Sequence, residues 1–230
     1  MAFMYTVFFS PTANGYKILL MLEALAVSYD ICHIDLTRDE QHLPAYLQLN
    51  PHAKIPVLLD NETRQVVVES AAVLLYLADK HARFCGTSPE QRWQVVQWLI
   101  WQVSSLGPMA GQNYHFHHQA PQPDTYSATR YLNQTRTLFQ VFEQAIAEHP
   151  FICGEFSIAD MAIYPWLRLH NVLQVSLEAL PRTTQYLQRM AQRDDVRRAY
   201  AAGAPYQQRA KGDVDKLQAI AGRLERRSAG

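Results

Sequence analysis

Apolar side chains recur with two different spacings at the start of the chain. Tyr5–Phe9 and Tyr29–Leu36 are short stretches rich in aromatic and β-branched residues, which favour strands. Between them, apolar residues recur at helical spacing from Ile18 to Leu25, and Asn14 is positioned to act as the N-cap. The pattern therefore predicts a strand, a helix and a second strand, in that order.

The next segment predicts a short helix, a hairpin and a longer helix. The short helix runs from about Gln41 to Leu49, and the hairpin pairs Lys54–Asp60 with Gln65–Val68. Glu69-Ser70 then begins a strongly apolar helix. Strands that alternate with helices imply a sheet covered by helices, and a hairpin adds antiparallel strands. The order β-α-β, short helix, β-β-α predicts a thioredoxin-like α/β domain over residues 1–82.

The rest of the chain has the pattern of helices. Residues 83–89 are predicted to be a linker, and residues 90–230 an all-α C-terminal domain. Within that domain, Ser157-Ile158-Ala159-Asp160 has the arrangement of a capping box, in which Ser157 caps a helix and Asp160 reaches back. Other helices are predicted at 89–114, 124–148 and 182–193, followed by a polar tail.

Composition and charge narrow the possible partners. Lys plus Arg and Asp plus Glu both number 21, and hydrophobic residues make up 48% of the 230. The hydrophobic fraction predicts a folded core. The equal numbers of positive and negative side chains give no support to nucleic acid or an anionic membrane as a partner. Cys32, Cys85 and Cys153 are far apart in sequence, which favours a reducing, cytoplasmic compartment over a disulfide framework. The apolar start is interrupted at residues 10–15, too early for a secretory or membrane segment, and no later stretch predicts a membrane span.

Several motifs, in their order along the chain, resemble those of cytosolic glutathione transferases up to about residue 200. The motifs are Ser10-Pro11-Thr12-Ala13-Asn14-Gly15, Lys54-Ile55-Pro56-Val57, Glu69-Ser70 and Ser157-Ile158-Ala159-Asp160. Two stretches, 12–17 and 107–116, are similar to signatures of the bacterial nu-class and fungal Ure2-like branch, although Ala13 replaces the usual proline. The resemblance implies a homodimeric, glutathione-dependent disulfide-bond oxidoreductase in which glutathione itself is the sulfur nucleophile.

Glutathione is an acidic tripeptide analogue, and the chain offers partners for each part of it. A cis peptide bond before Pro56 would turn the backbone of Ile55 toward the cysteinyl amide; the alternative is an ordinary proline at a strand start. Ser70 at a helix N-terminus suits the γ-glutamyl carboxylate, and Glu69 can accept the ammonium group. The alternative for this pair is a simple helix cap.

Three further residues are candidates for glutathione binding. Gln41 and Lys54 are expected at the glycyl end of the ligand, unless they are only solvated surface residues. Arg130 matches the region from which this branch contributes an arginine of the helical domain; the alternative is an exposed surface charge.

The reactive centre is expected at the turn that contains Thr12 and Asn14. A free thiol has a pKa of about 8.5, so its thiolate needs stabilisation at neutral pH. The Thr12 hydroxyl, the Asn14 amide and the following helix start can all donate to sulfur. In related branches a reactive cysteine occupies the place of Asn14, so no mixed disulfide with the chain itself is expected. Turn formation and capping are the alternative roles for both residues, and Ser10 and Tyr5 are fallback hydroxyls.

Three functional classes remain open on the sequence. The first is the disulfide reductase, and the second is a transferase or peroxidase that directs the same thiolate to electrophiles or hydroperoxides. The third is a non-catalytic glutathione-binding module, since fold does not fix function. His115, His117 and His118 match no standard zinc spacing, so no metal is expected, and they are assigned to the cleft entrance or a subunit interface.

Overall fold

The chain forms two compact units. The computed structural model describes residues 3–147, 149–208 and 212–228. One unit combines Met1–His81 with Asp194–Gly230, and the other comprises Ala82–Arg193. The sequence analysis assigned residues 90–230 to a single helical domain, so the two divisions differ after residue 193.

The first unit is built on a four-stranded mixed sheet. Its strands are β1 (Tyr5–Phe9), β2 (Tyr29–His33), β3 (Val57–Asp60) and β4 (Val66–Val68), in the spatial order β2-β1-β3-β4. β1 pairs with β2 in parallel, whereas β3 is antiparallel to both of its neighbours. This arrangement confirms the predicted thioredoxin-like fold. β2 ends at His33, earlier than the predicted Leu36, because the chain turns there into short 3₁₀ segments.

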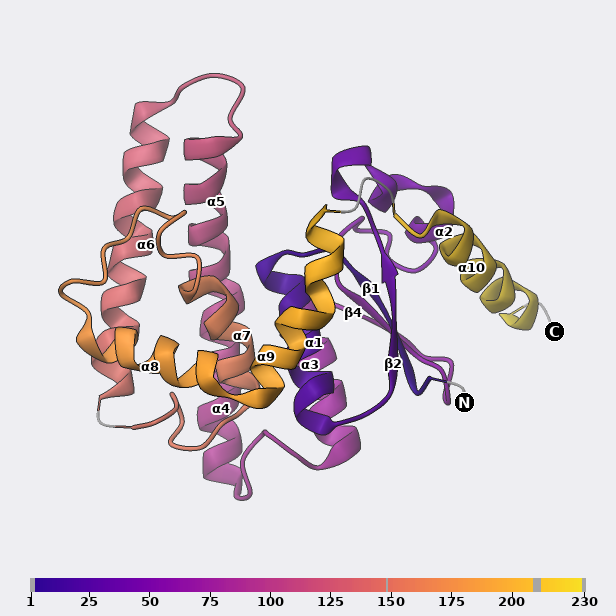
Figure 1. Cartoon of the computed structure of the whole chain (residues 1–230), viewed down its shortest axis with the longest axis horizontal. Helices are drawn as coiled ribbons and strands as arrows, with labels where there is room; N and C mark the ends of the chain where they lie inside the picture. The colour runs from indigo at the N-terminus through magenta and orange to yellow at the C-terminus, as the bar shows by residue number, and fades with distance from the viewer. Residues whose placement is uncertain (1–2, 148, 209–211, 229–230) are drawn as a thin grey trace. The chain divides into compact units, whose positions relative to one another are not determined.

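Helices cover both faces of this sheet. Figure 1 shows the sheet between α1 (Ala13–Leu25), α3 (Ser70–His81) and α9 (Asp194–Gly203) on one side and α2 (Pro44–Leu47) and α10 (Val214–Ser228) on the other. The strands β1 and β3 are buried along their whole length, as expected for strands covered on both faces. α9 packs against α1, and α10 packs against α2, which explains why the last segment belongs to this unit.

The start of α1 differs from the expected one. Thr12, not Asn14, is the N-cap: its backbone is extended and its Oγ1 accepts from the Gly15 amide at 3.2 Å. Asn14 lies one residue inside the helix. A Cβ on Gly15 would come within 2.2 Å of the Ser10 carbonyl oxygen, so only glycine fits where the helix begins against the end of β1.

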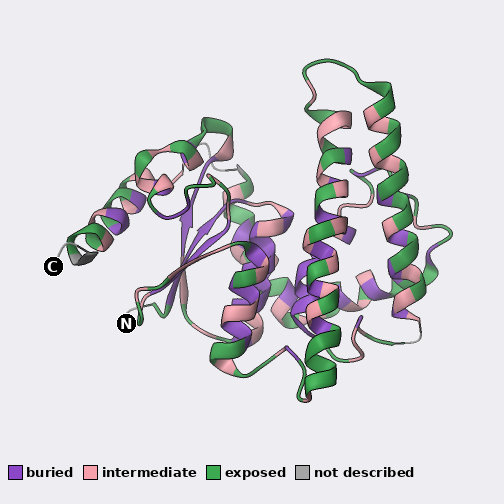
Figure 2. Ribbon diagram, turned by 180° about the vertical axis from the view of Figure 1, so that it is seen from behind, coloured by how far each residue is buried: buried purple, intermediate pink, exposed green. Residues whose placement is uncertain are grey.

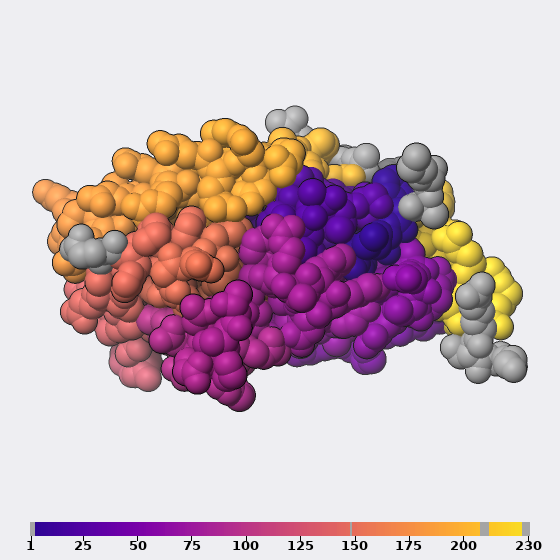
Figure 3. Space-filling model, turned by 90° about the horizontal axis from the view of Figure 1, so that it is seen from below, coloured from indigo at the N-terminus to yellow at the C-terminus, as the bar shows by residue number. Residues whose placement is uncertain are grey.

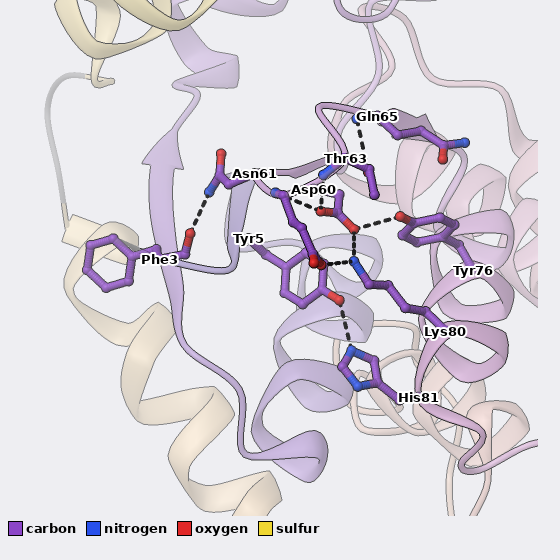
Figure 4. Close-up of polar contacts among 10 residues, drawn as sticks. Phe3, Tyr5, Asp60, Asn61, Thr63, Gln65, Tyr76, Lys80 and His81 are labelled. Atoms are coloured by element: carbon purple, nitrogen blue, oxygen red, sulfur yellow. Dashed lines mark hydrogen bonds and ion pairs between the residues drawn. The ribbon is translucent and has the colours of Figure 1, made fainter. Parts of the chain in front are cut away.

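A buried carboxylate joins the end of β3 to α3. Asp60 is fully buried and accepts hydrogen bonds from Tyr76 at 2.6 Å and Lys80 at 2.5 Å (Figure 4). It also accepts from the backbone amides of Glu62 and Thr63 in the turn that follows. Burial alone would raise the pKa of Asp60, but the hydrogen bonds from Lys80 and Tyr76 outweigh it and lower this pKa to about 2. The carboxylate is therefore ionised at neutral pH and fixes the hairpin to the helix.

The second unit is all helical. Its elements are α4 (Pro89–Trp101), a π-helical turn (Gln102–Leu106), α5 (Gly107–His118), α6 (Thr125–Ile146), α7 (Ile158–Leu167) and α8 (Pro181–Gln192). The predicted capping box of α7 is present, with Asp160 accepting from the Ser157 amide at 3.0 Å. α7 is buried along almost its whole length, whereas the outward sides of the other helices are exposed (Figure 2). Among the described residues, no helix is both long and apolar enough to cross a membrane.

Candidate functional site

A cavity of about 220 Å³ in the first unit brings together most of the predicted site residues. Six of them line it: Asn14, Lys54, Ile55, Pro56, Glu69 and Ser70. They come from the first turn of α1, the segment before β3 and the start of α3. Asn50 and His52, which the sequence analysis did not single out, complete the lining.

The segment before β3 lines one side of the cavity. The Ile55–Pro56 bond is cis, which is the first of the two possibilities that the sequence analysis left open for this proline. The Lys54 carbonyl accepts from Tyr46 Oη at 2.7 Å and from Asn50 Nδ2 at 2.8 Å. Tyr46 and Asn50 are both buried, so two buried side chains hold this carbonyl in place next to Lys54 and Ile55, which line the cavity.

The start of α3 forms the other side of the cavity. Ser70 is the first residue of the helix and is buried, while Glu69 before it has a left-handed backbone with φ of 68°. The Glu69 side chain is mostly exposed, and its Oε1 lies 3.9 Å from His52 Nδ1. The helix N-terminus offers backbone amides and the positive end of its dipole, whereas Glu69 offers a negative charge beside it. This pair of charges suits a ligand that carries a carboxylate next to an ammonium.

Lys17 lies directly behind this corner. Its side chain is almost completely buried in α1, and Nζ donates to Ser70 Oγ at 3.2 Å. Burial lowers the pKa of Lys17 to about 7, although the charge of Glu69 acts to raise it. A lysine inside an otherwise apolar helix is the signal that could have identified it from the sequence.

The remaining predicted residues lie outside this lining. Thr12 caps α1 two residues before Asn14, and Gln41 lies in a 3₁₀ turn where its Nε2 donates to Asp39 Oδ1 at 3.2 Å. Arg130 is exposed on α6, in the second unit. The structure therefore gathers six of the nine candidates in one cavity.

A second cavity, of about 360 Å³, lies in the helical unit and contains none of the candidates. It is lined by residues of the segment 82–95 and of the loop around Cys153. Burial raises the pKa of the Cys153 thiol to about 12, and burial likewise raises that of Cys32 to about 12. Both groups are therefore neutral thiols at pH 7, which makes them poor nucleophiles.

The three histidines on α5 make contacts within the helical unit. His117 Nδ1 lies 2.9 Å from the Asn113 carbonyl oxygen, and His118 Nε2 lies 3.0 Å from that of Val172. The described part of the chain contains no group of three His, Cys, Asp or Glu side chains that could hold a metal ion.

Comparison with known families finds two matching models. The model of the glutathione S-transferase N-terminal domain matches residues 4–79, and that of the glutathione S-transferase C-terminal domain matches residues 106–194. Among curated proteins, the disulfide-bond oxidoreductase YfcG of Escherichia coli (strain K12) is 37% identical over 196 residues, which is 83% of this chain and 91% of the relative.

Solved structures with the same fold contain glutathione or its disulfide. A glutathione transferase from Pseudomonas putida, with one glutathione disulfide bound per subunit, is 30% identical and has a TM-score of 0.79. The alignment covers 85% of this chain and 90% of that chain. A glutathione transferase family member from Pseudomonas fluorescens, with two glutathione molecules bound, is 29% identical and has a TM-score of 0.78. The alignment covers 85% of this chain and 91% of that chain.

Proposed function

The chain belongs to the glutathione S-transferase family, and we propose that it is a glutathione-dependent disulfide-bond oxidoreductase. In this proposal bound glutathione, rather than a cysteine of the protein, supplies the attacking thiolate. The observation that carries the proposal is the cavity that gathers Asn14, Lys54, Ile55, Glu69 and Ser70. The activity named for the Escherichia coli relative and the ligands of the Pseudomonas structures support it.

Each part of glutathione has a proposed partner in the cavity. The γ-glutamyl carboxylate is bound by Ser70 at the start of α3, with Lys17 behind the hydroxyl, and the ammonium group is accepted by Glu69. The backbone of Ile55 pairs with the cysteinyl residue, as an added strand would. Lys54 is assigned to the glycyl carboxylate.

The thiol is assigned to the turn between β1 and α1. Because the Thr12 hydroxyl accepts from the Gly15 amide through a lone pair, its hydrogen remains to be donated to sulfur. Asn14 lies in the cavity lining two residues further along. Together with the positive end of α1, these donors lower the pKa of the bound thiol and so increase the thiolate fraction.

The exchange reaction needs two glutathione molecules. The bound thiolate attacks one sulfur of the substrate disulfide, forms a mixed disulfide with it and releases the other sulfur as a thiolate, which takes up a proton. A second glutathione thiolate then attacks the mixed disulfide, so that glutathione disulfide and the second substrate thiol are released. The protein's own cysteines take no part, in keeping with the raised pKa values of the Cys32 and Cys153 thiols.

The proposal also covers assembly and compartment. A homodimer is proposed because α4 exposes Trp93 and Ile100 on one face, seven residues apart, at 63% and 49%. A reducing, cytoplasmic compartment is proposed because Cys32, Cys85 and Cys153 are all free thiols. Arg130 and Gln41 are retained as secondary contacts to glutathione.

Steady-state turnover tests the proposal directly. Reduction of a small dialkyl disulfide by glutathione is measured beside conjugation of an aryl halide, in the wild type and in Thr12→Ala and Asn14→Ala. Disulfide reduction is expected to dominate and to fall about tenfold or more in both variants, since each removes a hydrogen bond to a charged sulfur. Thr137→Ala, on the exposed side of α6, is the matched control and should retain full activity.

Other outcomes would redirect the assignment. Dominant conjugation would place the protein among the transferases that act on electrophiles. Glutathione binding without either activity would leave a binding module, and unchanged reduction in both variants would refute the assignment of the thiolate to this turn.

A further inference from the structure

The last helix of the chain presents an apolar stripe to the sheet. Leu217, Ile220 and Ala221 of α10 are buried, and Leu224 is half-buried, so the spacing is that of one helix face. Leu217 and Ile220 belong to a core cluster on the sheet face that α2 also covers. The C-terminal residues, yellow in Figure 3, lie directly against the violet surface of the N-terminal residues.

The segment just before α10 is attached to the edge of the sheet. The Asp213 amide donates to the His33 carbonyl oxygen at 2.8 Å, and the His33 amide donates to Asp213 Oδ2 at 2.9 Å. The Gly212 amide donates to Glu40 Oε1 at 3.2 Å. A Cβ on Gly212 would lie 2.9 Å from the His33 carbonyl oxygen and 1.6 Å from Glu40 Oε2, so a larger residue would have to shift this attachment. The segment therefore continues the hydrogen bonding of β2 at its free edge.

A second attachment follows one turn later. Lys216 Nζ donates to the Ile31 carbonyl oxygen at 2.6 Å and pairs with Asp30 Oδ2 at 2.7 Å. Beneath this segment Cys32 is fully buried, with Sγ 3.8 Å from the Asp213 carbonyl oxygen. The attachments thus cover a thiol that the rest of the sheet would leave at an open edge.

The residues on the far side of the same cluster reach the cavity. Tyr46 and Leu49, which α10 helps to cover, belong to the cluster, and Ile55 packs against it while lining the cavity. Tyr46 also donates to the Lys54 carbonyl oxygen at 2.7 Å. α10 and the cavity therefore share one wall, with the apolar cluster on one side and the Lys54–Ile55 segment, which lines the cavity, on the other.

From this shared wall we propose that α10 is a positioning element for the glutathione site, which holds α2 and the Lys54–Pro56 segment in the binding conformation. The inference rests on the proposed function, because it assumes that glutathione binds in this cavity. α2 itself is only four residues long and cannot hold its place by helical hydrogen bonds alone. Leu217 and Ile220 are the positioning residues, since they belong to the cluster and do not themselves line the cavity.

The test compares the full-length wild type with the double variant Leu217→Ala/Ile220→Ala. Glutathione affinity is measured by calorimetry, and kcat and KM for glutathione and for the disulfide are measured separately. The Kd and KM for glutathione are expected to rise roughly fivefold or more, with kcat and the KM for the disulfide changed less than twofold. Alkylation at Cys32, mapped by mass spectrometry with buried Cys85 as the internal reference, is expected to increase in the variant.

Two controls separate positioning from general loss of stability. Leu173→Ala/Ile146→Ala removes the same side chains from buried positions in the helical unit and should leave the glutathione affinity unchanged. Gln218→Ala changes an exposed position of α10 itself and should do the same. If the double variant of α10 does not fold, Leu224→Ala, which removes a half-buried contact, replaces it.

The outcomes distinguish the two proposals. If the wild type does not bind glutathione, the proposed function fails. If the wild type binds but the α10 variant has unchanged affinity while Cys32 becomes reactive, α10 only covers the sheet and the positioning role is refuted. An equal loss of affinity in the Leu173→Ala/Ile146→Ala control would refute it as well.

Discussion

Replacing Lys17 with methionine is expected to change how the stability of the protein depends on pH. Lys17 is buried in α1 with its Nζ on Ser70 Oγ, and burial lowers its pKa from 10.5 to about 7. In the unfolded chain the same group keeps a pKa of about 10.4. Between pH 7 and pH 9 the unfolded state therefore binds a proton that the folded state has largely lost.

The sign and size of the effect follow from proton linkage. Stability rises with pH wherever the unfolded state binds more protons, by about 1.36 kcal/mol per pH unit for one full proton. Lys17 is half-titrated in the folded state at pH 7, so its contribution from pH 7 to pH 9 is about 2 kcal/mol. This contribution is complete above pH 10.5 and is lost as the pH falls through about 7. Methionine has a similar volume and no proton to lose, so the variant should lack this increase.

Urea unfolding at pH 7 and at pH 9, followed by circular dichroism, measures the difference between the wild type and Lys17→Met. The background titration of other groups cancels in that comparison. Lys80→Met is the matched control, because the ion pair with Asp60 raises the pKa of Lys80 and keeps it charged at both pH values. A difference that stays constant between pH 7 and pH 9 would show that Lys17 remains charged in the fold and would refute the argument.

Three further predictions concern stability and assembly. Asp60→Asn should lower the free energy of unfolding, measured by urea denaturation, by about 3 kcal/mol, because it breaks the buried ion pair with Lys80. Glu62→Gln changes the exposed partner of the same lysine and should lower it by less than about 1 kcal/mol. Gly15→Ala should destabilise the protein by about 2 kcal/mol or more, because the new Cβ would lie 2.2 Å from the Ser10 carbonyl oxygen. Gly111→Ala, whose Cβ would lie 3.6 Å from its nearest neighbour in Trp166, should be close to neutral, and equal melting temperatures of the two variants would contradict this. Trp93→Glu should convert the proposed homodimer into a monomer in analytical ultracentrifugation, and a wild type that already sediments as a monomer would refute the interface.

The sequence predicted the sheet well because its signals are local. Alternation and β-branching mark the strands, and the Ile55-Pro56 and Glu69-Ser70 motifs place the two sides of the cavity. The helix cap was misassigned because Thr12 and Asn14 are both good capping residues, and only the backbone conformation distinguishes them. Lys17 escaped notice since a single charge in an apolar helix is usually assigned to the exposed face.

The C-terminal helices could not be predicted as easily. α9 and α10 are rich in charged residues, so their composition resembles a solvated tail. The spacing of Leu217, Ile220 and Leu224 was visible, but nothing local indicates which surface such a stripe will cover. That information lies in the apolar face of the sheet, about 160 residues or more away in the chain.

The return of the chain to its first unit has a consequence for synthesis. Since Met1–His81 is completed only by residues after Asp194, the N-terminal unit cannot finish folding while the helical unit is still emerging from the ribosome. The intervening residues 82–193, by contrast, form a continuous unit that can close on its own contacts first. During translation the sheet face with Phe8, Cys32 and Val57 would be covered only by α2 and its neighbouring residues until α10 is released. Folding of the first unit is therefore expected to be completed only after α10 has left the ribosome, and until then the β2 edge of the sheet would stay open to other chains.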